Sequence, residues 1–120
     1  LSGDIEMPAP ILPSATFKDN LAQLPSNEGV DRIELVDREG AIVAAIENQP
    51  GKQGSLAVYH YLKEQFGALN GDAARAGLAL FAEHVEDARN RPGAHPNIDR
   101  LFEIAAGADE LAVVIIAAKV

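Results

Sequence analysis

The segment from Pro50 to Ser55 has the clearest chemical character in this 120-residue chain. Gly51 and Gly54 precede a stretch with helical periodicity, and glycine allows backbone conformations that other residues avoid. The first N–H groups of a helix are free and lie at the positive end of its dipole, so they can bind an anion. Lys52 adds a mobile cation. The candidate ligand site, for a carboxylate, sulfate or phosphate, is therefore Lys52, Gln53, Gly54 and Ser55.

The same segment also fits a structural turn in which Ser55 caps a helix beginning near Leu56. It is not a Walker A loop, because Lys52 precedes the second glycine instead of following it. The sequence leaves both interpretations open.

Two histidine–aspartate pairs form a second candidate site. One pair is three residues apart and the other four, so each would share one face of a helix. Imidazole and carboxylate groups suit zinc, iron or manganese, although the spacing matches no metal motif and H-E-x-x-H is absent. The simpler interpretation places one histidine beside an apolar stripe and the other at a helix start, and we expect no cofactor. The candidate metal ligands are His84, Asp87, His95 and Asp99.

No pattern in the chain supplies a nucleophile, a base and an orienting group together, so no catalytic residue is assigned. Ser55 lies outside any G-x-S-x-G elbow. The consecutive Tyr59, His60 and Tyr61 spread around a helix, so either Tyr59 or His60 should reach the surface. His60 points away from Ser55 and would join its site only if the His95 segment folds alongside.

Composition limits the classes of function. The chain is 48% apolar and 23% charged, which is typical of one globular domain. Its net charge of −8 argues against nucleic-acid and membrane partners. Without cysteine, an export signal or an 18-residue apolar run, we expect an acidic cytoplasmic protein.

The chain divides into a short start and one domain. Prolines at 8, 10 and 13 predict an irregular lead-in over residues 1–15, within which Met7 is an alternative first residue. Residues 16–120 form the predicted domain. Helices are expected near 17–24, 56–66, 73–89 and 96–106, with strands at 32–36, 41–47 and 111–116.

Two segments of the chain carry a family resemblance. They read Pro50-Gly51-Lys52-Gln53-Gly54-Ser55-Leu56-Ala57-Val58-Tyr59-His60 and His95-Pro96-Asn97-Ile98-Asp99-Arg100-Leu101. The chain, from about Thr16 to Val120, resembles a family of short bacterial proteins of unknown function. The resemblance implies a bacterial, single-domain protein and carries over no catalytic residue.

The element order predicts an α+β fold: a small three-stranded, mainly antiparallel sheet with helices packed on one face. The sheet combines a hairpin with the C-terminal strand. Residues 42–46 are apolar on both faces, so we expect the second strand to be central, the order to be 1-2-3, and Arg32 and Glu34 to lie on a polar edge. The helices at 56–66 and 73–89 should cover one face.

An edge position would leave the apolar strand at 111–116 with unpaired backbone groups. A homodimer through this strand would cover it, since twofold dimers are the commonest oligomers. Alternatively, the proline-rich lead-in folds over it.

We therefore predict a non-enzymatic binding or assembly module. The alternative is a small ligand-binding protein or enzyme that uses an anion site in the Lys52–Ser55 loop.

Overall fold

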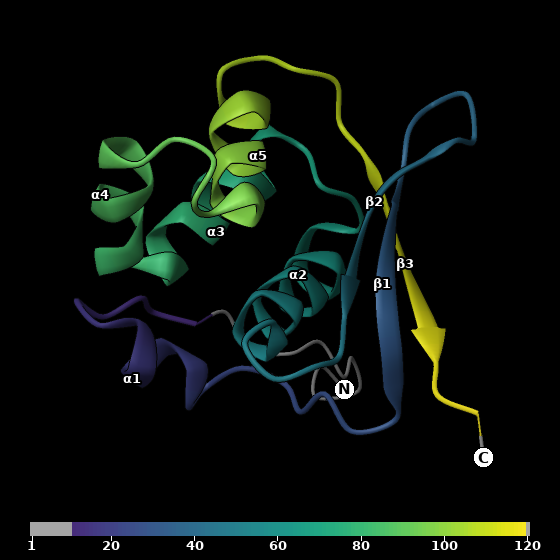
Figure 1. Ribbon diagram of the computed structural model, residues 1–120, viewed down its shortest axis with the longest axis horizontal. Helices are drawn as coiled ribbons and strands as arrows, with labels where there is room; N and C mark the ends of the chain where they lie inside the picture. The colour runs from purple at the N-terminus through teal and green to yellow at the C-terminus, as the bar shows by residue number, and fades with distance from the viewer. Residues whose placement is uncertain (1–10, 120) are drawn as a thin grey trace, which may run out of the picture.

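A computed structural model describes residues 11–119 of the chain (Figure 1). The elements, in chain order, are α1 (Phe17–Leu21), β1 (Val30–Val36), β2 (Ile42–Glu47), α2 (Gln53–Phe66), α3 (Gly71–Phe81), α4 (Glu83–Asn90), α5 (Pro96–Ala105) and β3 (Ala112–Ala117). The predicted α+β class with a three-stranded antiparallel sheet is confirmed. Most of the predicted lead-in, residues 1–10, lies outside the described part.

The hairpin between β1 and β2 forms where the turn residues predicted it. Asp37 accepts hydrogen bonds from the N–H groups of Glu39, at 3.0 Å, and Ala41, at 2.9 Å. Gly40 has φ of +86°, which glycine adopts without strain. A short polar turn therefore sets the register of the strand pair.

The strand order is β2-β1-β3, so the predicted order with the second strand in the centre is wrong. β1 is central and pairs antiparallel with both neighbours. The apolar start of β2 is at an edge instead, with Ile42 and Val43 58% and 52% exposed. Apolarity on both faces of a strand can thus reflect exposed apolar residues and need not reflect a central place.

The central strand β1 can carry Arg32 and Glu34 because their side chains lie on the face of the sheet that is not covered by helices. Arg32 donates to Glu34 at 2.9 Å and to Asp31 at 2.7 Å. Ile33 and Leu35 point to the opposite face and are fully buried. Strand alternation therefore gives β1 one ion-paired face and one core face, and Arg32 and Glu34 do not lie on an edge strand.

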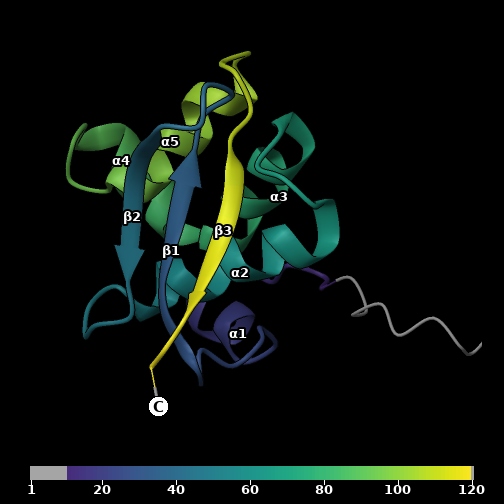
Figure 2. The ribbon, with the colours of Figure 1, turned by 90° about the vertical axis from the view of Figure 1, so that its right-hand side faces the viewer.

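Within residues 11–119, all the helices lie on one side of the sheet and the other face carries none (Figures 1 and 2). α2 packs against all three strands, while α3 packs mainly on α2 and α5. Of the two helices expected to cover the sheet, only α2 lies directly on it. The buried core, to which the sheet and α2 both contribute, includes Ile33, Leu35, Ile46, Leu56, Leu62 and Val113.

The predicted helix at 73–89 is two helices, α3 and α4, separated at Ala82. Ala82 has φ of 51° and ψ of −120°, a conformation that glycine adopts readily and alanine does not. Among the described residues it is the one non-glycine with positive φ. The break redirects the chain just before His84.

Ala82→Gly should therefore raise the free energy of unfolding by about 1 kcal/mol, since the strain at such a residue is roughly 1–3 kcal/mol and exceeds the entropic cost of glycine. Urea denaturation measures this change. Ala79→Gly is the matched control, because Ala79 is exposed within α3 and the same change there should cost about 1 kcal/mol. Equal destabilisation by both substitutions would contradict the strain at Ala82.

No helix within residues 11–119 has the length and apolar character needed to cross a membrane.

Candidate functional site

A cavity of about 460 Å³ lies among the starts of α2 and α5, helix α1 and the junction of α3 with α4. All four residues of the predicted ligand site line it: Lys52, Gln53, Gly54 and Ser55. His84 and His95, two of the predicted metal ligands, line it as well. Segments as far apart in sequence as Phe17 and Ile98 therefore meet at one concave site.

The start of α2 supplies the polar wall of the cavity. The helix begins at Gln53, so Ser55 lies in its first turn and the predicted cap at Ser55 is wrong. Lys52 is the N-cap residue and makes no side-chain capping bond. Within residues 11–119, the N–H groups of Gln53, Gly54 and Ser55 have no hydrogen-bond partner. They are therefore available to a ligand that accepts hydrogen bonds.

Aromatic side chains supply the apolar wall. The Phe17 ring stacks on that of Phe81 with centroids 5.3 Å apart, and it is nearly perpendicular to the ring of His84, with centroids 5.0 Å apart. Gly54 lies so close to Phe17 that a Cβ atom there would be 3.0 Å from the ring. Glycine at this position thus brings the start of α2 against the aromatic wall.

Two hydrogen-bonded contacts hold α1 in place, and with it Phe17. The amide of the fully buried Asn20 donates to the carbonyl oxygen of Leu80 at 2.9 Å. The N–H of Phe17 donates to a carboxylate oxygen of Glu83 at 2.7 Å. Hydrogen bonds from the backbone N–H groups of Glu83 itself and of Phe17 lower the pKa of this carboxyl.

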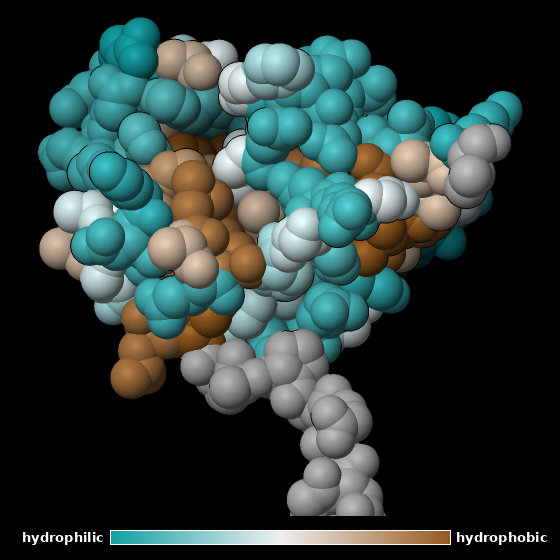
Figure 3. Space-filling view, turned by 90° about the horizontal axis from the view of Figure 1, so that it is seen from below, coloured by the Kyte–Doolittle hydropathy of each residue, from teal (hydrophilic) through white to brown (hydrophobic). Residues whose placement is uncertain are grey.

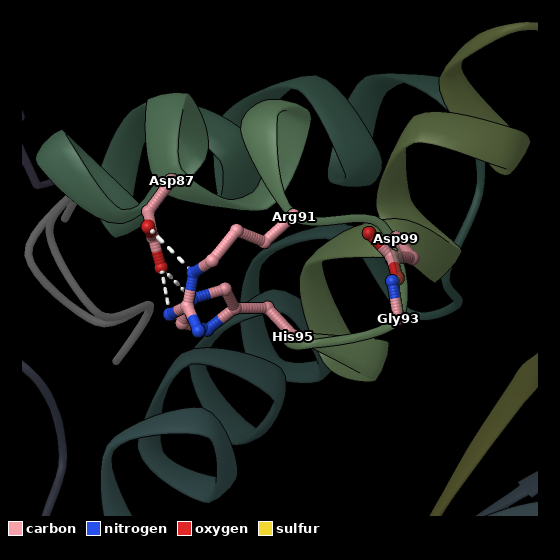
Figure 4. Close-up of polar contacts among 5 residues, drawn as sticks. All are labelled: Asp87, Arg91, Gly93, His95 and Asp99. Atoms are coloured by element: carbon pink, nitrogen blue, oxygen red, sulfur yellow. Dashed lines mark hydrogen bonds and ion pairs between the residues drawn. The ribbon is translucent and has the colours of Figure 1, made fainter.

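Asp87 anchors His95 at the rim of the cavity (Figure 4). Its carboxylate contacts the guanidinium of Arg91 and, at 2.5 Å, Nε2 of His95. The hydrogen bonds from Arg91 and then from His95 hold the pKa of Asp87 well below its usual range, so it stays a carboxylate. Asp87 thereby fixes the ring of His95 through one nitrogen.

The four candidate metal ligands do not converge. The ring centroids of His84 and His95 are 6.1 Å apart, and Asp87 binds His95 directly. Asp99 points away and accepts a hydrogen bond from the N–H of Gly93 at 3.0 Å (Figure 4). Within the described residues, no three histidine, aspartate or glutamate side chains form a group that could hold a metal ion.

The buried side chain of Tyr59, on α2, holds the start of α5 in place. Its side chain is fully buried, and its hydroxyl donates to the carbonyl oxygen of Asn97 at 2.7 Å and accepts from Arg100 at 3.0 Å. Burial raises the pKa of Tyr59 to about 12, against the opposing charge of Arg100. Of the two residues expected to reach the surface, His60 is the one that does so in part, and it does not line the cavity.

Sequence reasoning missed the aromatic wall and the hydrogen bonds of Tyr59. Phe17 precedes Gly54 by 37 residues, and no local pattern relates them. The helical spacing around Phe81 predicted only that its ring is buried. A partial signal was available in Tyr59, because a buried tyrosine hydroxyl nearly always has a hydrogen-bond partner.

A second hollow, of about 600 Å³, lies between the β1–β2 turn and the ends of α3 and α5. Its lining mixes Asp37, Asp109 and Glu110 with Arg38 and Arg75. Arg38 pairs with Asp109 at 3.4 Å, and Arg75 pairs with Asp72 at 2.6 Å. These two arginines are therefore already neutralised, whereas Lys52 in the first cavity has no ion-pair partner within residues 11–119.

Comparison with known proteins identifies the family of this chain but assigns no activity to it. None of the curated proteins or solved structures matches this chain. Residues 17–115 match the model of a family described as an uncharacterised protein conserved in bacteria (DUF2322). These residues include every element of the fold except the last positions of β3, and they include the whole cavity lining. The chain therefore belongs to this bacterial family of uncharacterised proteins.

Proposed function

We propose that this protein binds a small organic anion with an apolar body in the cavity at the start of α2. The observation that carries the proposal is the charge of the lining. The chain has 18 aspartate and glutamate residues, yet none of those within residues 11–119 lines this cavity. Its ionisable lining residues are Lys52, His84 and His95, all of which carry positive charge when protonated.

The wall at α2 would bind the charged group of the ligand. Free N–H groups at a helix start bind carboxylates and phosphates directly, and the helix dipole favours a negative charge there. Lys52 has no ion-pair partner in the described residues, so its ammonium group is available. Local contacts can bind an anion despite the net charge of −8, because distant surface charges are screened over about 8 Å at physiological salt.

The aromatic wall would bind the rest of the ligand. Phe17, Leu21 and Phe81 offer apolar contact beside the polar wall, and apolar and polar groups together are the usual composition of a small-molecule site. The volume of about 460 Å³ is within the range for such sites, roughly 300–1,000 Å³. An inorganic ion would leave the aromatic wall without a contact.

Nucleophilic catalysis is less well supported by this geometry. A hydroxyl group, an imidazole and a carboxylate do occur together in Ser55, His95 and Asp87. However, no hydrogen bond joins Ser55 to His95 in the described part of the chain, and such a bond is the mark of an activated serine. Binding is the function that these contacts favour.

Phenyl phosphate and benzoate should therefore raise the melting temperature, and benzyl alcohol, their neutral counterpart, should not. Calorimetric titration of phenyl phosphate should show Lys52→Ala weakening the affinity by about tenfold, the loss expected for one charged contact. Inorganic phosphate should bind more weakly than phenyl phosphate, because it makes no contact with Phe17 and Phe81.

Lys63→Ala is the matched control, since Lys63 lies at the opposite end of the same helix and outside the cavity. It should leave the affinity for phenyl phosphate unchanged. Equal weakening by Lys52→Ala and Lys63→Ala would show that only the overall charge matters. Equal stabilisation by benzyl alcohol would show that the site does not select anions.

A further inference from the structure

The two edges of the sheet differ in how they are protected against pairing with another strand. β2 has a register irregularity opposite Leu35 and Val36 and ends in a charged residue, Glu47. Bulges and charges are common devices that keep an edge strand from pairing. β3 carries only alanine, valine and isoleucine, with neither a charge nor a proline. An apolar, uncharged edge of this kind is a template for further strand pairing.

The backbone groups on the free side of β3 can be identified from its hydrogen bonds. The N–H of Ala118 donates to Gly29, on the side of β1, at 2.9 Å. Leu111 exchanges hydrogen bonds with Leu69 on the other side, at 2.8 and 3.2 Å. Backbone groups alternate sides along a strand. Those of Val113, Ile115 and Ala117 therefore point away from β1 and have no partner within residues 11–119.

We propose that this free edge pairs antiparallel with the same edge of a second copy of the chain. The pairing centres on Ile115, which then lies opposite its own copy, and it places Val113 opposite Ala117 of the second copy. All three free residues thereby exchange hydrogen bonds. β3 forms one edge of the sheet (Figure 2). Pairing through this edge would join the two sheets into one, with the helices of both copies on the same side.

The charges that flank β3 favour a second copy as the occupant. Asp109 and Glu110 precede the strand, and Lys119 follows it. Antiparallel pairing of two copies brings the acidic end of each strand to the basic end of the other. The strand between these ends is neutral, so the net charge of −8 does not act across the contact itself.

The side chains on both faces of β3 support the same register. Val114 is 39% exposed on the outer face and would contact Ile116 of the second copy. On the helix side, Ile115 is half-buried and would be covered by its own copy. Cross-strand pairs of β-branched residues stabilise antiparallel sheets. Apolar residues also reach the surface beside the sheet in the view from below (Figure 3).

Sedimentation velocity on the full chain at micromolar concentration tests the proposal. The wild type should sediment as a dimer of the 12.7 kDa chain. Val114→Lys should give a monomer, since a lysine on an edge strand prevents pairing, and Glu34 opposite it on β1 should preserve the fold. Ile42→Lys is the matched control: it makes the same change on the same face at the other edge and should leave the dimer intact.

Ala117→Pro provides a second variant. It removes a free N–H without breaking a bond to β1, which is the one kind of strand position that tolerates proline. This variant should be monomeric with an unchanged circular dichroism spectrum. If Val114→Lys fails to fold, the oligomeric state of Ala117→Pro tests the proposed dimer instead. A monomeric wild type overturns the proposal. A dimer that persists in the Ala117→Pro variant also overturns the proposal. The same holds if Ile42→Lys dissociates the dimer as fully as Val114→Lys does.

Discussion

Replacing Tyr59 by alanine is expected to lower the free energy of unfolding by about 4 kcal/mol, the usual cost of emptying a buried aromatic site. The ring is fully buried beneath the helices, and its hydroxyl holds both Asn97 and Arg100. The substitution removes the packed ring and leaves two polar partners without their contact. Urea denaturation measures the loss as a lower midpoint.

Tyr59→Phe separates the two contributions, because it keeps the ring and removes the hydroxyl. It should cost about 1–2 kcal/mol, the range for losing a buried hydrogen-bonding group. A cost near that of the alanine variant would mean that hydrogen bonding dominates. If neither variant changes the urea midpoint, Tyr59 does not connect α2 to the start of α5 as described.

Gly77→Val should cost about 3 kcal/mol, the upper part of the usual range for overpacking a core. Gly77 lies where α3 crosses α2 and α5, and a Cβ there would be 2.8 Å from a methyl group of Leu101 and 2.9 Å from one of Leu62. A larger side chain must push the helices apart. Thermal or urea unfolding measures the effect.

Ala79→Val controls for the lower helix propensity of valine, since Ala79 is exposed on the same helix. It should cost less than about 1 kcal/mol. Gly77→Ala should fall between the two variants, because the tips of Leu62 and Leu101 can move aside for one methyl group. Equal effects of valine at positions 77 and 79 would contradict the close helix contact at Gly77.

Local patterns predicted most elements of this fold. The turn at Asp37–Gly40, the helix after His95 and the apolar run before Ala117 each have a short-range physical cause, and each forms where expected. The strand order was not predictable in this way. It depends on the pairing of β1 with β3, whose residues lie about eighty positions apart in the sequence. No local pattern relates two strands at that separation.

The break at Ala82 was hidden for a similar reason. The apolar spacing continues from Phe81 to Val85, so the periodicity predicted one uninterrupted helix. Alanine is also the best helix former, which makes a positive φ at this position unexpected. Tertiary contacts at the junction, including Phe17 with Glu83, override that local preference.

The candidate site was also predictable only where it depends on local sequence features. The sequence predicted its polar half, Lys52–Ser55, because loop chemistry and helix starts are local features. It named the His95 segment only as the part that would have to fold alongside for His60 to join the site, and the cavity lining includes His95 but not His60. The aromatic half depends on α1, whose position is determined by contacts of Asn20 with a helix sixty residues later.

The central place of β1 also governs the order in which the protein can fold during synthesis. Its hairpin partner β2 follows within a few residues, but its other partner lies more than eighty residues later, where Arg32 pairs with Ile116. Contacts of such long range form slowly, because a long loop must close first. The ribosome therefore releases the middle strand of the sheet half-paired. β3, which is synthesised more than sixty residues after β2, completes the sheet.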